Sequence, residues 1–576
     1  MTGLRALLQR NPRPPAPIPL GNRRDIRNFM STSNATRNDR WPAQIKYIVG
    51  NEACERFSYY GMKGILAGYM TGAILKGGLN MSDDRATSLF HLFVFVNYFT
   101  PLLGAWVSDK IFGRYNTILW VSLFYCLGHG VLAMNDLFPG VDAKFNLLCV
   151  GLTLIAFGAG GIKPCVSAFM GDQFKPDQGH LMQKAYGAFY FSINFGSFFS
   201  FIFIPQLRDA YGYGWAFGVP GILMGLATII FWFGRKHYQR VEPMGDPNWL
   251  KKVLWMVACV IGTIAIWYLK AKTGVSGSWL AGSLAGVGLL ALAIFTVRLH
   301  RRVDSTQEKL DASAYTVWWY GLTTPLMGKA GGLWDSASLH FTPKSLDHGV
   351  SMGRILSIFA LIPAFWALFD QSNSTWVLQG NKMAQVTLSG FWKSAFGWFF
   401  GDTINAENMQ STNPALVMIL VPLLTLGIYP MLGRSVTPLR RMGCGMFFAA
   451  FSYIIVGWLQ HRIEAGEQIN VAWQILPYVF LTTGEVLISA TGLEFAFTQA
   501  APEMKSTIMS FWLLTVAAGN ALVSIITSVL SSDAAGHSGA VSSGRFYQYA
   551  GMTAIVGVLF VIIATRYRYR DAAARE

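Results

Sequence analysis

Hydrophobic residues in this chain gather in long runs, which are separated by shorter polar stretches. Since about 20 consecutive apolar residues of α-helix cross the hydrocarbon core of a bilayer, each run predicts a transmembrane helix. The runs cover residues 45–76, 86–108, 116–136, 145–169, 185–207, 214–234, 253–269, 278–297, 355–379, 413–433, 442–460, 472–499, 506–530 and 546–565. We therefore expect an all-helical polytopic membrane protein with 14 transmembrane helices.

The predicted helices divide into six, two and six. The middle windows, 253–269 and 278–297, hold almost no polar residues, so we expect this inserted pair to take no part in transport chemistry. The expected parts are a basic N-terminal arm (1–44), a six-helix bundle (45–240), the inserted pair (241–299), a cytoplasmic linker (300–353), a second six-helix bundle (354–566) and a tail (567–576). Two six-helix bundles fit the major facilitator fold, in which substrate binds between the bundles near the midplane.

The distribution of charge orients the chain in the membrane. Only 13% of the residues are charged, but the net charge is +16. Basic residues of membrane proteins gather in cytoplasmic loops, so this excess does not indicate a nucleic-acid partner. The basic groups that fall on one side are the N-terminal arm, Lys110 with Arg114, Lys175 with Lys184, Arg235 with Lys236, Arg298 with Arg301, Arg434 with Arg440, and Arg566 with Arg568. We therefore expect both termini in the cytoplasm and the chain in the inner membrane.

Cysteine and histidine usage indicates no bound group. The six cysteines lie in or beside apolar runs and form no CxxC pair. They predict neither a disulfide nor a metal site. The nine histidines are scattered. We expect no cofactor.

The first window carries a polar stripe. Six residues with polar groups fall within an arc of about 140° on a helix, and they are Glu52, Glu55, Arg56, Tyr59, Tyr60 and Lys63. An ionisable side chain at the bilayer centre costs about 2.5 to 3.5 kcal/mol, so the stripe should face protein or a wet cavity. It is either a buried ion-pair network that fixes helix packing or an ion or proton pathway, and we favour the pathway.

A lysine interrupts the fourth window. Lys163 lies in the sequence Gly160-Gly161-Ile162-Lys163-Pro164, where the proline can bend the helix. A lysine so deep in an apolar window needs an acidic partner. The candidates are Glu52, Glu55 and Glu485, the last of which stands alone in an apolar run.

Several other polar residues in the windows can each be interpreted as structural or as functional. Arg354 and Asp370 lie near the ends of the apolar seventh helix, where each is either an interfacial residue or a functional one. His91 titrates near neutral pH and suits proton coupling, but it is equally a hydrogen-bonded packing residue. Asn194 and Asn413 either hold amide groups of a ligand or bond neighbouring helices.

Four sequence motifs in the right order give the chain a resemblance to a known family. They are Glu52-x-x-Glu55-Arg56-Phe-Ser-Tyr-Tyr-Gly, Gly161-Ile162-Lys163-Pro164 through Gly171-Asp172-Gln173-Phe174, the run from Phe189 to Ser197, and Thr491-Gly492-Leu493-Glu494-Phe495. These motifs resemble the proton-dependent oligopeptide transporter (POT, or PTR2) family. The inserted helix pair is similar to bacterial members, whereas His91 with Tyr98 seven residues later is similar to animal ones.

The resemblance implies inward symport of protons with di- and tripeptides, by a protein that functions as a monomer in a lipid bilayer. The implied proton-coupling residues are Glu52, Glu55, Arg56 and Lys163, with His91 as a further candidate. The implied substrate-binding residues are Lys63 and Lys163 for the peptide carboxylate, Glu485 for its amino group, and Tyr59, Tyr60, Tyr98, Asn194, Trp366, Asn413 and Trp512 for the pocket. The implied gating residues are the pair Lys63 and Asp370, the pair Lys163 and Glu485, and Arg354.

Two positions depart from the family pattern, and other functions stay open. Lys63 replaces the usual arginine, which exchanges a bidentate fork for a point charge. Thr425 stands where animal members carry an aspartate, so Arg354 lacks that partner. A carrier of another anion or of a drug-like molecule is the alternative, although a nitrate carrier would not need Glu485. A polytopic membrane enzyme is a further alternative, but no nucleophile stands near a base in the sequence.

Overall fold

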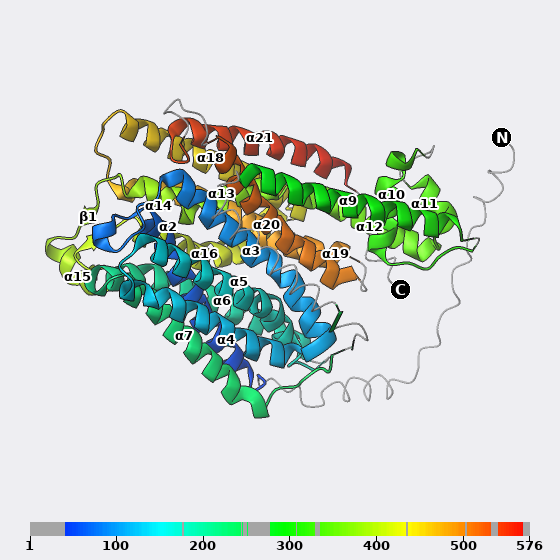
Figure 1. Ribbon diagram of the computed structural model, residues 1–576, viewed down its shortest axis with the longest axis horizontal. Coiled ribbons are helices and arrows are strands. Elements are labelled where there is room, and N and C mark those ends of the chain that lie inside the picture. The colour runs from blue at the N-terminus through cyan, green and yellow to red at the C-terminus, as the bar shows by residue number, and fades with distance from the viewer. Residues whose placement is uncertain are drawn as a thin grey trace.

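The computed structural model describes residues 41–175, 178–243, 245, 250–251, 277–306, 308–328, 334–433, 436–500, 504–530, 539–567 and 569, which are mostly helical. A small hairpin pairs strand β1 (Val386–Thr387) antiparallel with β2 (Thr403–Ile404), and helix α15 (Gly390–Phe400) connects them. Figure 1 shows this hairpin at one end of the molecule and helices α10 (Ala314–Thr323) and α11 (Asp335–His340) at the other. We call these the hairpin end and the linker end.

Six long helices form the first bundle around one apolar core. They are α2 (Ile45–Thr71), α3 (Asp83–Val107), α4 (Arg114–Ala133), α5 (Val141–Gly171), α6 (Gly179–Tyr211) and α7 (Tyr213–Phe233). Each overlaps most of one of the first six windows. The chain reverses direction at short connections, so successive helices run antiparallel.

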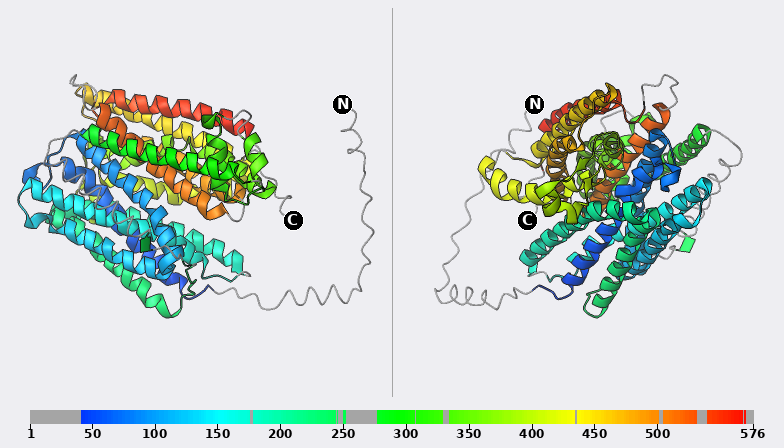
Figure 2. Two further views of the ribbon diagram at one scale, coloured as in Figure 1. Left: turned by 45° about the vertical axis from the view of Figure 1, so that its right-hand side comes forward. Right: turned by 90° about the vertical axis from the view of Figure 1, so that its left-hand side faces the viewer.

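The second bundle surrounds a separate core and is less regular. Its helices are α12 (Pro343–Phe359), α13 (Pro363–Phe369), α14 (Thr375–Gly380), α16 (Thr412–Pro422), α17 (Tyr429–Leu432), α18 (Pro438–Glu464), α19 (Ile475–Gln499), α20 (Lys505–Leu530) and α21 (Ser543–Arg566). A π-helical segment, Leu423–Ile428, joins α16 to α17. Figure 2 shows the two bundles side by side, with the first in blue to green and the second in green to red.

The expected seventh helix is broken into pieces. Pro363 has no backbone N–H to donate and its ring crowds the preceding turn, so α12 ends at Phe359 and α13 starts at the proline. After α13 a 3₁₀ segment, Asp370–Asn373, leads to Ser374, whose φ of −129° and ψ of −88° are not helical. The break places Asp370 at the start of the 3₁₀ segment, in the interior of the protein.

Eleven helical segments of the described residues are long and apolar enough to cross a membrane. α2 is not among them, although its 27 residues are long enough, because it carries the charged stripe. With α2, these segments match the windows of both bundles. The window 278–297 lies in α9 (Gly277–Asp304), and the window 253–269 lies outside the described residues.

The linker differs from its expected limits. α9 continues to Asp304, beyond the expected boundary at 299. At the other side α12 begins at Pro343, eleven residues before the expected start of the second bundle at 354. The Thr342 hydroxyl accepts a hydrogen bond from the Ser345 N–H, which together with a proline in the first turn is a strong helix start. Apolar periodicity alone did not reveal this polar first turn.

Glycines let helices touch backbone to backbone. A Cβ on Gly104 of α3 would lie 2.4 Å from the carbonyl oxygen of Gly160 in α5. In the second bundle, a Cβ on Gly445 of α18 or on Gly484 of α19 would lie 2.8 Å from the carbonyl oxygen of the other. Small residues at such crossings are typical of membrane helix pairs. Gly160 lies just before Lys163, so the close crossing fixes where that lysine enters the bundle.

Candidate functional site

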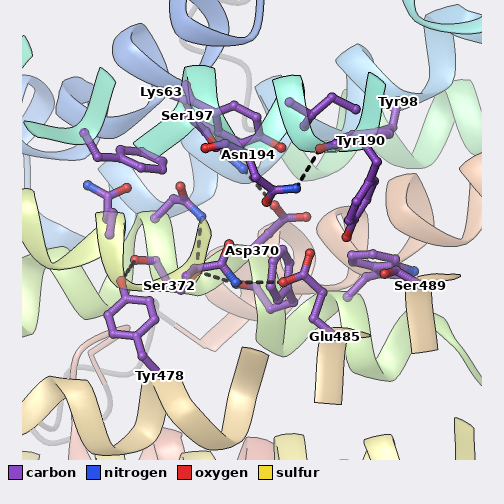
Figure 3. A pocket seen from close by; sticks show the side chains of 18 residues that line it. Lys63, Tyr98, Tyr190, Asn194, Ser197, Asp370, Ser372, Tyr478, Glu485 and Ser489 are labelled. Atoms are coloured by element: carbon purple, nitrogen blue, oxygen red, sulfur yellow. Dashed lines mark hydrogen bonds and ion pairs between the residues drawn. The ribbon is translucent and has the colours of Figure 1, made fainter. Parts of the chain in front are cut away.

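A cavity of about 170 Å³ lies between the two bundles. Its lining from the first bundle is Tyr60, Lys63, Tyr98, Tyr190, Ile193, Asn194, Ser197 and Phe201. Its lining from the second bundle is Trp366, Phe369, Asp370, Ser372, Asn373, Gln410, Asn413, Tyr478, Glu485 and Ser489. Figure 3 shows Lys63 and Asn194 on one side of this cavity and Glu485 and Tyr478 on the other. Charged side chains of opposite sign thus line one interior space.

Most residues expected to bind substrate line the cavity, but three do not. Tyr59 is fully buried, and its hydroxyl accepts a hydrogen bond from Asn97 Nδ2 at 2.8 Å. Trp512 lies behind the wall, where its ring packs edge-on against Phe359 and Trp366. Lys163 also lies outside the lining. Tyr59 and Trp512 therefore support the wall instead of forming it.

Glu485 is held by an amide. Asn413 Nδ2 donates to Glu485 Oε2 at 2.7 Å and contacts Thr482 Oγ1 at 3.1 Å. Glu485 is only half-buried, and no hydrogen bond to its Oε1 is found in the described part of the chain. One carboxylate oxygen is therefore oriented by the protein, and the other is available to a ligand.

Lys163 pairs with none of the three acids that the sequence offered. Its Nζ makes no hydrogen bond to the residues that the structure describes. Instead, Nζ lies 4.3 Å from the ring centre of Tyr59 and 4.1 Å from that of Tyr98. Aromatic faces attract an ammonium group at such distances. The expected contact between Lys163 and Glu485 is therefore absent in this conformation.

The acids of the first helix form a compact cluster with Arg56. Arg56 Nε lies 2.7 Å from Glu52 Oε1 and 2.9 Å from Glu55 Oε2. Glu52 and Glu55 are 1% and 0% exposed. One arginine thus faces two carboxylates, which leaves a formal excess of negative charge in a dry environment.

A chain of hydrogen bonds links His91 to Lys63. Lys63 Nζ lies 2.8 Å from Asp370 Oδ1, and Asn520 Nδ2 donates to Asp370 Oδ2 at 2.7 Å. Because Asn520 donates with its nitrogen, its Oδ1 accepts from His91 Nδ1, at 2.7 Å. The other ring nitrogen, Nε2, lies 2.9 Å from Ser374 Oγ. The sequence predicted Lys63, Asp370 and His91, but it offered no signal for Asn520 or Ser374.

Several contacts between the bundles lie at the hairpin end. Arg208 of α6 pairs with Glu407, and Asn408 Nδ2 donates to the Phe201 carbonyl at 3.1 Å. Gln410 Nε2 donates to the Gly64 carbonyl at 2.9 Å. Burial raises the pKa of the Glu407 carboxyl, although the Arg208 guanidinium opposes this shift. These contacts close the cavity toward the hairpin end, and the sequence did not reveal them because their partners are 199 to 346 residues apart.

Arg354, expected to act as a gate, is remote from the central cavity. It is exposed in the middle of α12 and does not belong to the cavity lining. Thr425 does not replace a lost partner, because its hydroxyl donates to the Val421 carbonyl of its own helix. Arg354 therefore makes no contact with the other gating residues in this conformation.

Sequence comparison finds relatives among animal transporters. The chain is 32% identical over 472 residues to solute carrier family 15 member 2 of Rattus norvegicus, covering 78% of this chain and 54% of that protein. It is 33% identical over 434 residues to peptide transporter 3 of Caenorhabditis elegans, covering 74% of this chain and 51% of the relative. The chain thus spans about half the length of the curated relatives it matches.

Structure comparison finds similarity to solved transporters over a longer part of the chain. A crystal structure of an auto-inhibited POT family peptide transporter superposes with a TM-score of 0.70 at 37% identity, covering 92% of this chain and 98% of that one. The expected all-helical major facilitator fold is thereby confirmed. A sequence profile described as "PTR2: POT family" matches residues 115–541. The chain therefore belongs to the POT family.

Proposed function

We propose that this chain is a proton-coupled symporter that imports di- and tripeptides by alternating access. The observation that carries this proposal is the cavity between the bundles, which presents Glu485 on one wall and Lys63 on the opposite one. A zwitterion satisfies both ends of such a cavity at once, whereas a simple anion leaves Glu485 without a counter-charge. The relatives named as peptide transporters support the same substrate class.

Uptake of labelled dialanine into vesicles that contain the purified protein tests the proposal. With the lumen more alkaline than the medium, we expect dialanine to accumulate above its outside concentration. Each pH unit supplies about 1.4 kcal/mol per proton, which permits roughly tenfold accumulation. A protonophore should abolish the accumulation. Accumulation of nitrate or another small anion without dialanine transport would favour the alternative carrier instead.

The orientation in the membrane follows from the basic loops. We place both termini in the cytoplasm of a cell with the protein in its inner membrane, as the distribution of lysine and arginine indicates. The hairpin end then faces outward, and the contacts there close the cavity to the outside. A bacterial source and a monomeric active unit remain predictions from the sequence.

Proton coupling is assigned to two groups of residues. Glu52, Glu55 and Arg56 form the first group, in which a proton on either acid relieves the excess negative charge. His91 belongs to the second group, because the Asn520 amide bridges it to Asp370. A proton that reaches the hydrogen bonds between His91 and Asp370 weakens the attraction between Asp370 and Lys63. It thereby favours opening of the cavity toward the outside.

The pair of Lys63 and Asp370 is proposed as the outer gate. Both side chains are buried, so a single charge reversal leaves two like charges together in the interior, which costs at least about 3 to 5 kcal/mol. We expect Lys63→Asp and Asp370→Lys each to abolish dialanine uptake. The double swap restores the attraction and should recover part of the rate.

A matched control for the gate uses an exposed ion pair at the same end. Lys393 Nζ lies 3.0 Å from Asp402 Oδ2, and both side chains are exposed within the hairpin of the second bundle. Exposed pairs contribute little, so swapping these two charges should leave uptake nearly unchanged. A gate swap with no recovery beyond the sum of its single effects in the double-mutant cycle would count against the proposed pair.

A further inference from the structure

A second cavity, of about 290 Å³, opens at the linker end between α12 and α21. Its lining is Arg354, Ser357, Ile563, Arg566 and Tyr567, and it shares no residue with the central cavity. Arg354 comes from the middle of α12, whereas Arg566 is the last residue of α21. Two guanidinium groups from separate helices therefore face one space.

Neither arginine is neutralised by the protein. Both are exposed, and no ion pair to either is found among the residues that the structure describes. Two like charges that line one cavity repel each other unless an anion lies between them. The planar guanidinium fork matches the oxygens of a phosphate group in particular, and the Tyr567 hydroxyl adds a further hydrogen-bond donor.

The surface beside this cavity is apolar. α21 exposes Ile555, Val558, Leu559 and Ile562, which recur at the spacing of one helix face and lead toward the cavity wall at Ile563. In a membrane protein this stripe faces the acyl chains of lipid. A phosphate site at the end of a lipid-facing stripe suits a molecule that carries both a phosphate and long acyl chains.

We propose that the cavity between α12 and α21 binds the phosphate headgroup of an anionic phospholipid, with Arg354 and Arg566 as its ligands. The acyl chains lie along the exposed stripe of α21. In the proposed orientation the lipid belongs to the inner leaflet, and only this leaflet assignment rests on the proposed function. Both helices belong to the second bundle, so a rocking motion of the bundles leaves the site intact and the lipid remains a structural ligand.

Native mass spectrometry of the detergent-purified chain tests the proposal without any transport measurement. The probes are palmitoyl-oleoyl phosphatidylglycerol, the zwitterionic palmitoyl-oleoyl phosphatidylcholine and inorganic phosphate. We expect the wild-type protein to retain phosphatidylglycerol in preference to phosphatidylcholine. Arg566→Gln, and separately Arg354→Gln, should weaken phosphatidylglycerol binding about tenfold or more, because each removes a charge-assisted contact. Arg566→Lys should weaken phosphatidylglycerol binding less than Arg566→Gln does, because lysine keeps the positive charge.

A matched control is available on α9 at the same end of the molecule. Arg301 and Arg302 are exposed and lie outside the cavity, so replacing either by Gln removes the same charge elsewhere. Those variants should retain phosphatidylglycerol as the wild type does. Melting curves without added lipid should be equal for all variants, which separates lost binding from misfolding.

Three outcomes would overturn the lipid site. Equal retention of the two phospholipids would show that the arginines do not select an anionic headgroup. Equal weakening in the α9 variants would assign the effect to general surface charge. Stabilisation by inorganic phosphate that matches the effect of phosphatidylglycerol would identify a free anion, and not a lipid, as the ligand.

Discussion

Glu55→Gln should abolish the proton-driven accumulation of dialanine while leaving counterflow exchange measurable. Glu55 is fully buried, and Arg56 Nε lies 2.9 Å from its carboxylate. A glutamine fills the same space but carries no titratable proton, so the cavity can still alternate while transport is no longer linked to protons. With a gradient of two pH units, we expect the wild type to accumulate dialanine up to roughly a hundredfold per coupled proton, and the variant only to equilibrate.

The matched control for this variant is Glu467→Gln. Glu467 pairs with Arg462 in an exposed loop, where its charge has no access to the central cavity. Its loss should leave both accumulation and exchange close to the wild-type values. If Glu55→Gln still concentrated dialanine against its gradient, Glu55 would have no part in proton coupling. If it lost exchange as well, the residue would be needed for the structure and not specifically for coupling.

Glu485→Gln should weaken the binding of dialanine about tenfold to a hundredfold. A charge-assisted hydrogen bond between the peptide ammonium and a carboxylate contributes about 1.5 to 3 kcal/mol, and glutamine removes the charge. Asn413 holds only one of the two oxygens, so the other can receive the ammonium. The measurement is a direct binding assay, such as calorimetry, on the purified protein.

N-acetylated dialanine provides the control ligand for Glu485. It has no amino cation, so the substitution should change its affinity very little. Equal losses of affinity for both ligands would contradict the assignment of Glu485 to the amino terminus. The comparison also separates recognition from folding, because a misfolded variant would lose both ligands together.

The structure changes the expected picture of carboxylate binding. Lys63 is engaged by Asp370, and Lys163 is held against two tyrosine rings. A peptide carboxylate must therefore compete with Asp370 for Lys63 or draw Lys163 away from the rings. In either case ligand binding disturbs one of these contacts, and peptide binding is thereby coupled to the side chains of the proposed gates.

The sequence by itself determined the helices and the position of the charged stripe. Whether a segment spans a membrane depends on its own apolarity, so the windows of both bundles were predictable from local composition. The face of α2 that carries Glu52, Glu55 and Lys63 follows from helical periodicity, and those residues are buried as that face required. The four motifs likewise indicated the family, because they are stretches of contiguous sequence.

Only the tertiary structure decided which polar groups meet. His91 contacts Ser374 and Asn520, Glu485 contacts Asn413 instead of Lys163, and Arg208 contacts Glu407 across the bundles. Each of these pairs joins segments that are distant in sequence, and several of the groups are uncharged amides or hydroxyls that local composition does not distinguish from ordinary polar residues. Periodicity shows which face a side chain occupies, but the docking of the two bundles selects its partner.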